Sequence, residues 1–271
     1  MSARVRVGPE TPLVGWGELW TSRELLFFLA WRDLKVRYKQ TVLGVAWAML
    51  QPLLTMCVFA VFFGRLAGVP SDGIPYPLFS FAALLPWMLF ANALSGGAQS
   101  LVANQHLLTK VYFPRLHLPL ASVFVPLVDM VIGLLILIPL MAVYGRAPGP
   151  GVALLPAFVL LAILASLAAS LGLAVLNAMY RDFRYVVPFL VQLWLFVTPV
   201  AYPASLVPPA WRAVYGLNPM ATVVEGFRWA LLDGPAPELA MVCSSFATVL
   251  VGLSASLVLF RWLEDSIADV V

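Results

Sequence analysis

Six long stretches of the sequence are apolar and carry almost no charge. Five of them contain no Asp, Glu, Lys or Arg, and one contains a single acidic residue, Asp129. A helix needs about 20 apolar residues to cross a hydrocarbon core about 30 Å thick, whereas a barrel strand needs only about 10. Because lipid does not satisfy backbone hydrogen bonds, we predict an all-α integral membrane protein with six transmembrane helices. The stretches are 43–64, 77–103, 118–144, 151–180, 186–206 and 239–260.

The 271 residues leave room for a single transmembrane domain. We divide it into a cytoplasmic N-terminal segment with an interface helix (1–42), the six spans (43–262) and a cytoplasmic tail (263–271). Only 11% of the residues are charged, against about 25% in soluble proteins, which agrees with this class. The net charge of +3 is explained by the membrane topology, so we expect no nucleic-acid partner.

The distribution of Lys and Arg predicts how the chain is inserted. One set of connections, together with both termini, holds 12 of the 16 Lys and Arg residues, and the other set holds 4. Seven of the 12 precede Val42. Cytoplasmic segments carry the excess of positive charge, so both termini of this multi-pass protein are expected in the cytoplasm.

The segment before the first stretch predicts a helix in the plane of the membrane interface. Thr21 and Glu24 match a capping box with Thr21 as N-cap, and the helix would run to about Tyr38. Apolar and basic side chains would lie on different sides of it, as in interfacial helices that contact membrane lipids. An alternative is that this helix only anchors the protein to the membrane surface. The apolar set is Leu25, Leu26, Phe28, Leu29 and Val36, and the basic set is Arg32, Lys35 and Lys39.

Two cytoplasmic connections are expected to carry short helices. In 102–117 a helix of two to three turns would end before Pro114, whose ring removes a backbone donor and disfavours helix before it. The connection 177–185 has a similar composition and is shorter. Both would project from the membrane on the cytoplasmic side.

The outer connection between the last two stretches predicts another helix. Asn218 and Pro219 match a helix start, with Asn218 as N-cap and Pro219 at the first position. The helix 220–232 is too short to cross the membrane, so we expect a re-entrant or interfacial hairpin on the outer side. Its two charged residues, Glu225 and Arg228, are three positions apart and would pair locally, with substrate contact as the alternative.

The sequence contains no motif for catalysis or for ATP binding. It has no P-loop, no H-E-x-x-H and no nucleophile elbow, and His106 and His117 are not at ligand spacing. We therefore expect no catalytic residue, no metal site and no cofactor bound by this chain. Asp129 lies well inside a span, where an ionisable residue marks a functional site or a proton relay. A hydrogen bond between helices explains one carboxylate at least equally well.

Four long stretches, in order along the chain, carry a family resemblance. They are WRDLKVRYKQTVLGVAWAMLQP (31–52), LLTKVYFPRLHLPLA (107–121), NAMYRDFRYVVPFLVQLWLFVTPVAYP (177–203) and LNPMATVVEGFRWALL (217–232). With them the chain resembles the membrane subunits of type-2 ABC exporters, in the branch that exports lipid-linked polysaccharides such as O antigens, capsules and teichoic acids. The resemblance implies a permease in the bacterial cytoplasmic (inner) membrane.

The resemblance also implies partners. Two copies of the permease would face each other and work with two P-loop ATPase subunits, which bind the ATP and Mg²⁺. A coupling helix near 104–112 would sit in a cleft of the ATPase, and the 177–185 turn and the N-terminal helix would touch the same subunit. The residues implied at this contact are Asn104, Leu107, Leu108, Lys110, Val111, Tyr112, Arg181 and Asp182.

The first and fifth spans of the two copies would line a channel, closed by a gate at each end. A lipid diphosphate is a compact anion that Arg binds in bidentate geometry and Lys binds as a point charge. Sugar rings stack on aromatic side chains, although Trp and Tyr also form interfacial belts and Phe is common in packing. The implied residues are Arg32, Lys35, Arg37, Lys39, Leu43 and Gly44 for the diphosphate and cytoplasmic gate, Trp47, Trp194, Phe196 and Tyr202 for the channel, and Asn218, Pro219, Glu225 and Arg228 for the outer gate.

The expected function is export of a polyprenyl-diphosphate-linked polysaccharide by an ATP-driven ABC transporter. One alternative is a permease of the same architecture for a smaller lipid or drug. Another is an integral membrane transferase acting on lipid-linked sugars, which would need interfacial acids. Asp33 and Asp182 are scattered candidates for such acids.

Overall fold

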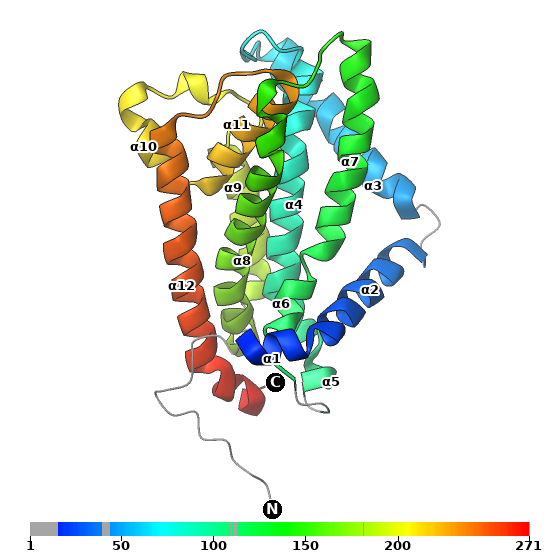
Figure 1. The fold of residues 1–271 in the computed structure, drawn as a ribbon, viewed down its shortest axis with the longest axis vertical. Coiled ribbons are helices and arrows are strands. Elements are labelled where there is room, and N and C mark those ends of the chain that lie inside the picture. The colour runs from blue at the N-terminus through cyan, green and yellow to red at the C-terminus, as the bar shows by residue number, and fades with distance from the viewer. Residues whose placement is uncertain (1–15, 40–43, 109, 111–112, 181, 271) are drawn as a thin grey trace, which may run out of the picture.

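The computed structural model describes residues 16–39, 44–108, 110, 113–180 and 182–270. Within these ranges every regular element is a helix, which confirms the all-α fold class. Figure 1 shows the helices gathered into one elongated body, with α2 (Arg23–Lys39) lying obliquely beside its lower end.

Five helical stretches in the described ranges are long and apolar enough to cross a membrane. Each coincides with one of the stretches predicted from the sequence. In chain order they are Val45–Leu66 (α3, Gly44–Phe59, and η1, Ala60–Leu66), Tyr76–Ala103 (α4), His117–Val143 (α6, His117–Ala121, and α7, Phe124–Val143), Pro150–Met179 (η2, Pro150–Leu154, and α8, Leu155–Met179) and Leu239–Glu264 within α12 (Leu239–Val270).

The stretch 186–206 differs from the prediction of one continuous span. Its helix, α9 (Phe183–Val197), has 15 residues and so is only about 22 Å long. Thr198 then adopts an extended backbone, because Pro199 follows it and a residue before proline avoids the helical region. The chain continues through irregular turns and three short elements. These are η3 (Ala204–Leu206), η4 (Pro209–Trp211) and α10 (Arg212–Tyr215).

Helix α4 forms the centre of the bundle. Of its 28 residues, 18 are buried, and it packs against α7, α8 and the buried helix α11 (Pro219–Leu232). Gly97 allows α4 to approach α8 closely, because a Cβ atom there would lie 2.6 Å from Ser170 Oγ. Small residues at such crossings are typical of helix packing in membranes, where close backbone contact replaces the hydrophobic driving force.

Helix α11 confirms the short helix predicted in the outer connection. Asn218 is its N-cap, and the Asn218 side-chain oxygen accepts a hydrogen bond of 3.1 Å from the Met220 backbone N–H. The helix ends at Asp233, which adopts a left-handed conformation with φ of 55°. Of its 14 residues, 13 are buried against α4, α8 and α12. A short helix at this depth is therefore shielded by protein, as its length requires.

Helix α2 reaches Lys39 as predicted, but the predicted capping box is wrong. Thr21 ends a separate short helix, α1 (Trp16–Thr21), and its hydroxyl donates a hydrogen bond of 2.7 Å to the Gly17 carbonyl. The hydroxyl is thereby used inside α1, so it does not cap α2. Glu24 is exposed in the first turn of α2.

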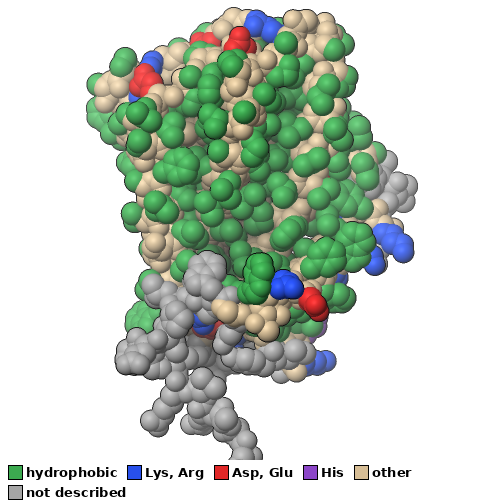
Figure 2. Space-filling model, viewed as in Figure 1, with side chains coloured by type: hydrophobic (Ala, Val, Ile, Leu, Met, Phe, Trp, Pro, Cys, Tyr) green, Lys and Arg blue, Asp and Glu red, His purple; other side chains and the backbone are tan. Residues whose placement is uncertain are grey.

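Charged and apolar side chains are separated on the molecular surface. Figure 2 shows a broad band of hydrophobic side chains on the visible face, with Lys, Arg, Asp and Glu toward its two ends. In Figure 1, α1, α2, α5 (Gln105–Leu108) and the end of α12 lie at one end of the molecule, and α10 and α11 lie toward the other. This separation agrees with a bundle that spans a membrane.

Candidate functional site

The two halves of α2 are held against the bundle in different ways. In its first half, Leu29 and Ala30 are buried. Leu29 belongs to an apolar cluster with Leu116 and Leu118 at α6, and Leu25 and Leu26 pack against this cluster. Every residue of α2 after Ala30 is exposed or only partly buried. The second half of the helix is therefore positioned by polar contacts, and these contacts lie along a groove.

The groove is an open cavity of about 590 Å³ between α2, α4, α6 and α7. We call it the α2 groove. Its α2 side presents two guanidinium groups, and its opposite wall presents amide, hydroxyl and carboxylate groups. The polar lining residues are Arg32, Asp33, Arg37, Asn92, Ser100, Asn104, His106, Ser122 and Asp129.

Arg32 joins α2 to the end of α4. Its guanidinium contacts Asp33 at 2.8 Å and donates a hydrogen bond of 3.0 Å to Asn104 Oδ1. The Asn104 amide in turn donates to the Ser100 carbonyl at 2.9 Å. Asn104, which the resemblance implied at the ATPase contact, is therefore used in the groove as the link between the two helices.

Arg37 and Tyr38 join the last turn of α2 to Asp129 of α7. The Arg37 guanidinium lies 2.5 Å from Asp129 Oδ2, and the Tyr38 hydroxyl donates to Asp129 Oδ1. Burial and the neighbouring carboxylate raise the pKa of Tyr38 above its ordinary value, so its hydroxyl stays protonated and donates. The predicted hydrogen bond between helices at Asp129 is confirmed, and its partners are residues that sequence reasoning did not connect to it.

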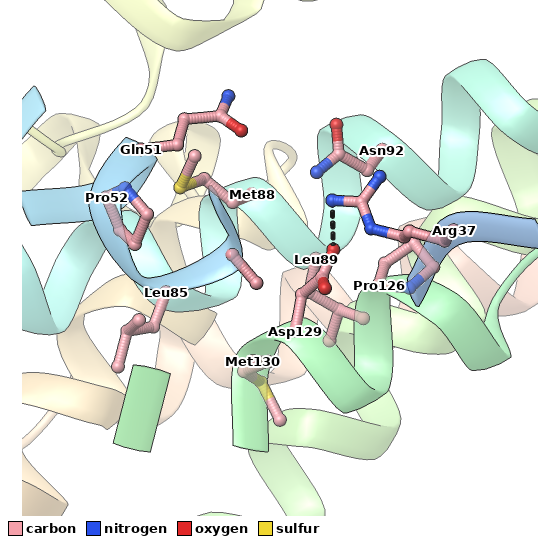
Figure 3. A pocket seen from close by; sticks show the side chains of 11 residues that line it. Arg37, Gln51, Pro52, Leu85, Met88, Leu89, Asn92, Pro126, Asp129 and Met130 are labelled. Carbon is pink, nitrogen blue, oxygen red and sulfur yellow. Dashed lines mark ion pairs between the residues drawn. The ribbon is translucent and has the colours of Figure 1, made fainter. Parts of the chain in front are cut away.

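Figure 3 shows this contact from close by, with the Arg37 guanidinium facing the Asp129 carboxylate below the Asn92 side chain. A smaller pocket continues from here toward α3, where Gln51 and Pro52 line it. The contact between Arg37 and Asp129 thus lies where α2, α3, α4 and α7 come together.

The four basic residues predicted as one gate cluster are divided by the structure. Arg32 and Arg37 line the α2 groove, whereas Lys35 and Lys39 are exposed and do not line it. The Lys35 ammonium lies 5.4 Å from the centroid of the Trp31 ring, on the outer side of the helix. Gly44, the other described residue of this set, begins α3, and Leu43 lies outside the described residues.

The helix predicted near 104–112 is shorter than expected. Helix α5 has four residues, and Lys110 lies in a turn beyond it with an exposed side chain. Leu107 and Leu108 pack against the apolar cluster beneath α2, so they face the permease itself. Asp182 precedes α9 and is exposed. Val111, Tyr112 and Arg181 lie outside the described residues.

Glu225 and Arg228 form the predicted ion pair, at 2.8 Å, and both side chains are buried. Arg228 also donates to the carbonyls of Val200 at 2.9 Å and Phe79 at 3.3 Å. The Glu225 carboxylate accepts from the Ala204 backbone N–H at 3.3 Å. The pair therefore fastens the irregular segment after α9 to α4 and α11, a role that its spacing in sequence did not reveal.

Asn218 fastens the same end of α9. The Trp194 indole donates to the Asn218 side-chain oxygen at 2.9 Å, and the Asn218 amide donates to Thr198 Oγ1 at 3.0 Å. The Trp194 ring also packs edge-on against Phe90, with the ring centroids 4.9 Å apart. Pro219 is buried at the first position of α11.

The other aromatic residues predicted to line a channel do not meet in one cavity of a single chain. Trp47 on α3 is 48% exposed and Phe196 on α9 is 62% exposed, so both present rings at the surface of the bundle. The Tyr202 hydroxyl donates to the Phe196 carbonyl at 3.1 Å and lies 2.9 Å from the Tyr215 hydroxyl, at the end of the molecule that carries α10. A path lined by Trp47 and Phe196 would need a second surface opposite them.

The groove brings positively charged and polar groups together. Two guanidinium groups lie on one wall, with Asp33 beside Arg32 and Asp129 beside Arg37, and amide and hydroxyl groups surround them. Within the described residues, no group of three or more His, Cys, Asp or Glu side chains is placed to hold a metal ion.

Comparisons with known proteins agree with the sequence pattern. The family described as ABC-2 type transporter matches residues 24–232. An O-antigen export system permease protein of Myxococcus xanthus is 35% identical over 255 residues, which are 93% of this chain and 94% of that protein. An O-antigen export system permease protein of Klebsiella pneumoniae is 27% identical over 78% of this chain and 81% of its own length. A polysialic acid transport protein of Escherichia coli is 24% identical over 87% of this chain and 92% of its own length.

Proposed function

Because the chain belongs to the ABC-2 type transporter family, we propose that it is the membrane-spanning permease subunit of an ATP-driven exporter of lipid-linked polysaccharide. The observation that carries this proposal is the similarity to an O-antigen export permease over 93% of this chain and 94% of that protein. The five apolar spans and the sequence-wide absence of a P-loop support it, because such a permease crosses the membrane and leaves ATP to another subunit.

The substrate in this proposal is a polysaccharide on a polyprenyl diphosphate. Its diphosphate would enter the α2 groove, where Arg32 and Arg37 lie on one wall. Arg matches the oxygens of a phosphate in bidentate geometry. On the side of α2 away from the groove, the exposed Phe27 and Trp31 rings stack and Lys35 lies over Trp31. Such side chains are typical of the headgroup region of a membrane.

The partners in this proposal are two P-loop ATPase subunits and a second copy of the permease. The ATPase would bind ATP and Mg²⁺ and would contact the end of the molecule that carries α1, α2 and α5. The excess of Lys and Arg on that side supports placing it, with both termini, in the cytoplasm. The second copy would supply the surface opposite Trp47 and Phe196, so that α3 and α9 of the two copies line the path.

The alternative functions gain no support from the site. For a transferase, Asp33 and Asp182 were the candidate acids, but Asp33 pairs with Arg32 and Asp182 does not line the groove. For export of a smaller lipid or drug, neither the described groove nor the named relatives offer support, because those relatives are named for O-antigen export and polysialic acid transport.

Co-purification of the affinity-tagged chain from its own host, extracted in mild detergent, tests this function. We expect a P-loop ATPase in equal molar amount, and deletion of the gene should cause lipid-linked polysaccharide to accumulate inside the cell. A chain that purifies alone and transfers sugars without an ATPase would contradict the proposal.

A further inference from the structure

We propose that Asp129 is a positioning residue, an internal anion that occupies Arg37 in the empty permease and gives it up to the diphosphate of the substrate. The proposal rests on the proposed function, because it concerns the same groove and the same substrate. It adds Asp129 of α7 to the residues of the cytoplasmic gate. It also proposes that substrate binding weakens the attachment of α2 to α7.

We call the contact of Arg37 and Tyr38 with Asp129 the latch, because it attaches the end of α2 to α7. Two consecutive residues, Arg37 and Tyr38, bind the two different oxygens of the Asp129 carboxylate. A carboxylate at this position in an apolar span is costly unless a charge and a hydrogen bond compensate it. Here both compensating groups come from outside the span, from the last turn of α2.

The second half of α2 has no buried side chain, so its position depends strongly on the latch. All buried side chains of α2 lie at or before Ala30, nine residues before the helix ends at Lys39. The segment after Ala30 has polar anchors at Arg32 and at the latch. Helix α3 begins at Gly44, five positions after α2 ends at Lys39, so the latch lies close in sequence to the start of the first span.

The latch is accessible from the groove. The Arg37 side chain is 39% exposed and the Asp129 side chain 15% exposed, and both line the same cavity of about 590 Å³. An anion that enters the groove can therefore reach the guanidinium without first unfolding α2. Asn92, which lines both the groove and the smaller pocket toward α3, lies beside this pair and offers an amide to the same anion.

A diphosphate is a stronger partner for Arg37 than the carboxylate is. It carries more negative charge and more acceptor oxygens, and it binds a guanidinium through two parallel hydrogen bonds. When it takes Arg37, Asp129 keeps the Tyr38 hydroxyl and loses its counter-charge. The end of α2 then loses its ion pair with α7 and keeps the Tyr38 hydrogen bond, so the attachment of α2 to α7 is weakened.

The test uses the complete permease–ATPase complex in nanodiscs of phosphatidylcholine, with geranylgeranyl diphosphate as the probe. ATPase activity is measured as the probe is titrated. In Asp129→Asn the competing charge is removed while an oxygen remains for Tyr38. We expect the half-maximal probe concentration to fall about two- to fivefold, as expected for loss of one partly exposed competing ion pair.

Matched variants separate competition from a loosened structure. Tyr38→Phe removes the hydrogen bond and leaves the carboxylate on Arg37, so we expect a shift of less than twofold. Asp129→Glu restores the charge and should return the half-maximal concentration toward the wild-type value. Asp72→Asn removes an acidic group that bonds Ser205 outside the groove, and it should change nothing. Equal shifts in Asp129→Asn and Tyr38→Phe would overturn the proposal.

Two further probes identify the source of the anion. Inorganic diphosphate should reproduce the shift at higher concentration, because it has the headgroup without the lipid. Phosphatidylglycerol in the nanodisc should not reproduce it. If phosphatidylglycerol alone gave the full effect, the site would belong to bulk lipid and the proposal would be overturned.

A distance measurement follows the latch directly. Spin labels at Lys39→Cys and Val131→Cys, in a complex whose permease has Cys57 and Cys243 replaced by Ser, report the separation of α2 from α7. Geranylgeranyl diphosphate should broaden or lengthen this distance, and an unchanged distance at saturating ATPase stimulation would refute the latch. A wild-type complex that did not respond to the probe at all would instead refute diphosphate recognition, and this inference with it.

Discussion

At the scale of single residues, two ion pairs of this permease join segments that lie far apart in the sequence. Arg228 fastens the chain after α9 to α4, and Asp129 fastens the end of α2 to α7. The first of these pairs is fully buried, whereas the second lies on the wall of a groove. Burial therefore indicates a structural role for the first pair, whereas the second is accessible to the anion that we propose.

Replacing Arg228 tests the structural role. Arg228→Gln leaves Glu225 as a buried charge without its partner and frees the carbonyls of Val200 and Phe79, so the free energy of unfolding should fall by about 3–5 kcal/mol. The fall is measured by unfolding of the purified permease in detergent. The double variant Glu225→Gln, Arg228→Met should lose less, because it leaves no unpaired buried charge. Export that fails while stability is unchanged would indicate a direct gating role in place of this one.

At the scale of elements, close approach between α4 and α8 holds the centre of the bundle. Gly97→Ala places a methyl group against the Ser170 side chain, 2.6 Å from its Oγ, so stability should fall by about 1–3 kcal/mol. The paired variant Gly97→Ala, Ser170→Gly removes the clash and should recover most of that loss. Thermal unfolding in detergent measures both, and equal stability of the single and double variants would show that the two residues do not meet.

The turn after α5 carries the second prediction about an element. Lys110 is exposed at the end of the molecule assigned to the ATPase, so Lys110→Glu should lower ATP-driven export several-fold while insertion into the membrane stays normal. Export is measured in cells, and insertion is measured from the amount of permease in the membrane fraction. Arg65→Glu, at an exposed site in η1 toward the other end of the molecule, is the matched control. Normal export in Lys110→Glu would remove this turn from the ATPase contact.

The elements also show what sequence could and could not predict. The apolar stretches and the start of α11 at Asn218 were predictable, because span length and cap chemistry are local properties. The partners of Asp129 were not, because Arg37 and Tyr38 lie 91 or more residues away and only the packing of α2 brings them together. The division of the basic residues between groove and outer face likewise depends on the rotation of α2 about its axis.

At the scale of the whole molecule, the fold separates two ends with different tasks. One end carries α1, α2, α5 and the α2 groove, and the other carries α10, α11 and the buried Arg228. The proposal places the first end in the cytoplasm. Cysteine labelling of intact cells tests this orientation, in a chain whose two native cysteines are replaced. Ser71→Cys should react with an impermeant maleimide from outside, and Lys110→Cys should react only after the membrane is opened. The reverse pattern would contradict the assigned topology.

Transport in proteoliposomes tests whether ATP drives export of the glycan through this permease. Permease and ATPase are reconstituted with polyprenyl-diphosphate-linked polysaccharide, with the ATPase facing outward, and the glycan left on the outer surface is measured with a membrane-impermeant glycosidase. The account predicts that ATP moves glycan into the lumen, where the enzyme does not reach it, and that a complex with an ATPase inactivated in its P-loop does not. Glycan that stays on the outer surface while the active complex hydrolyses ATP would contradict the account.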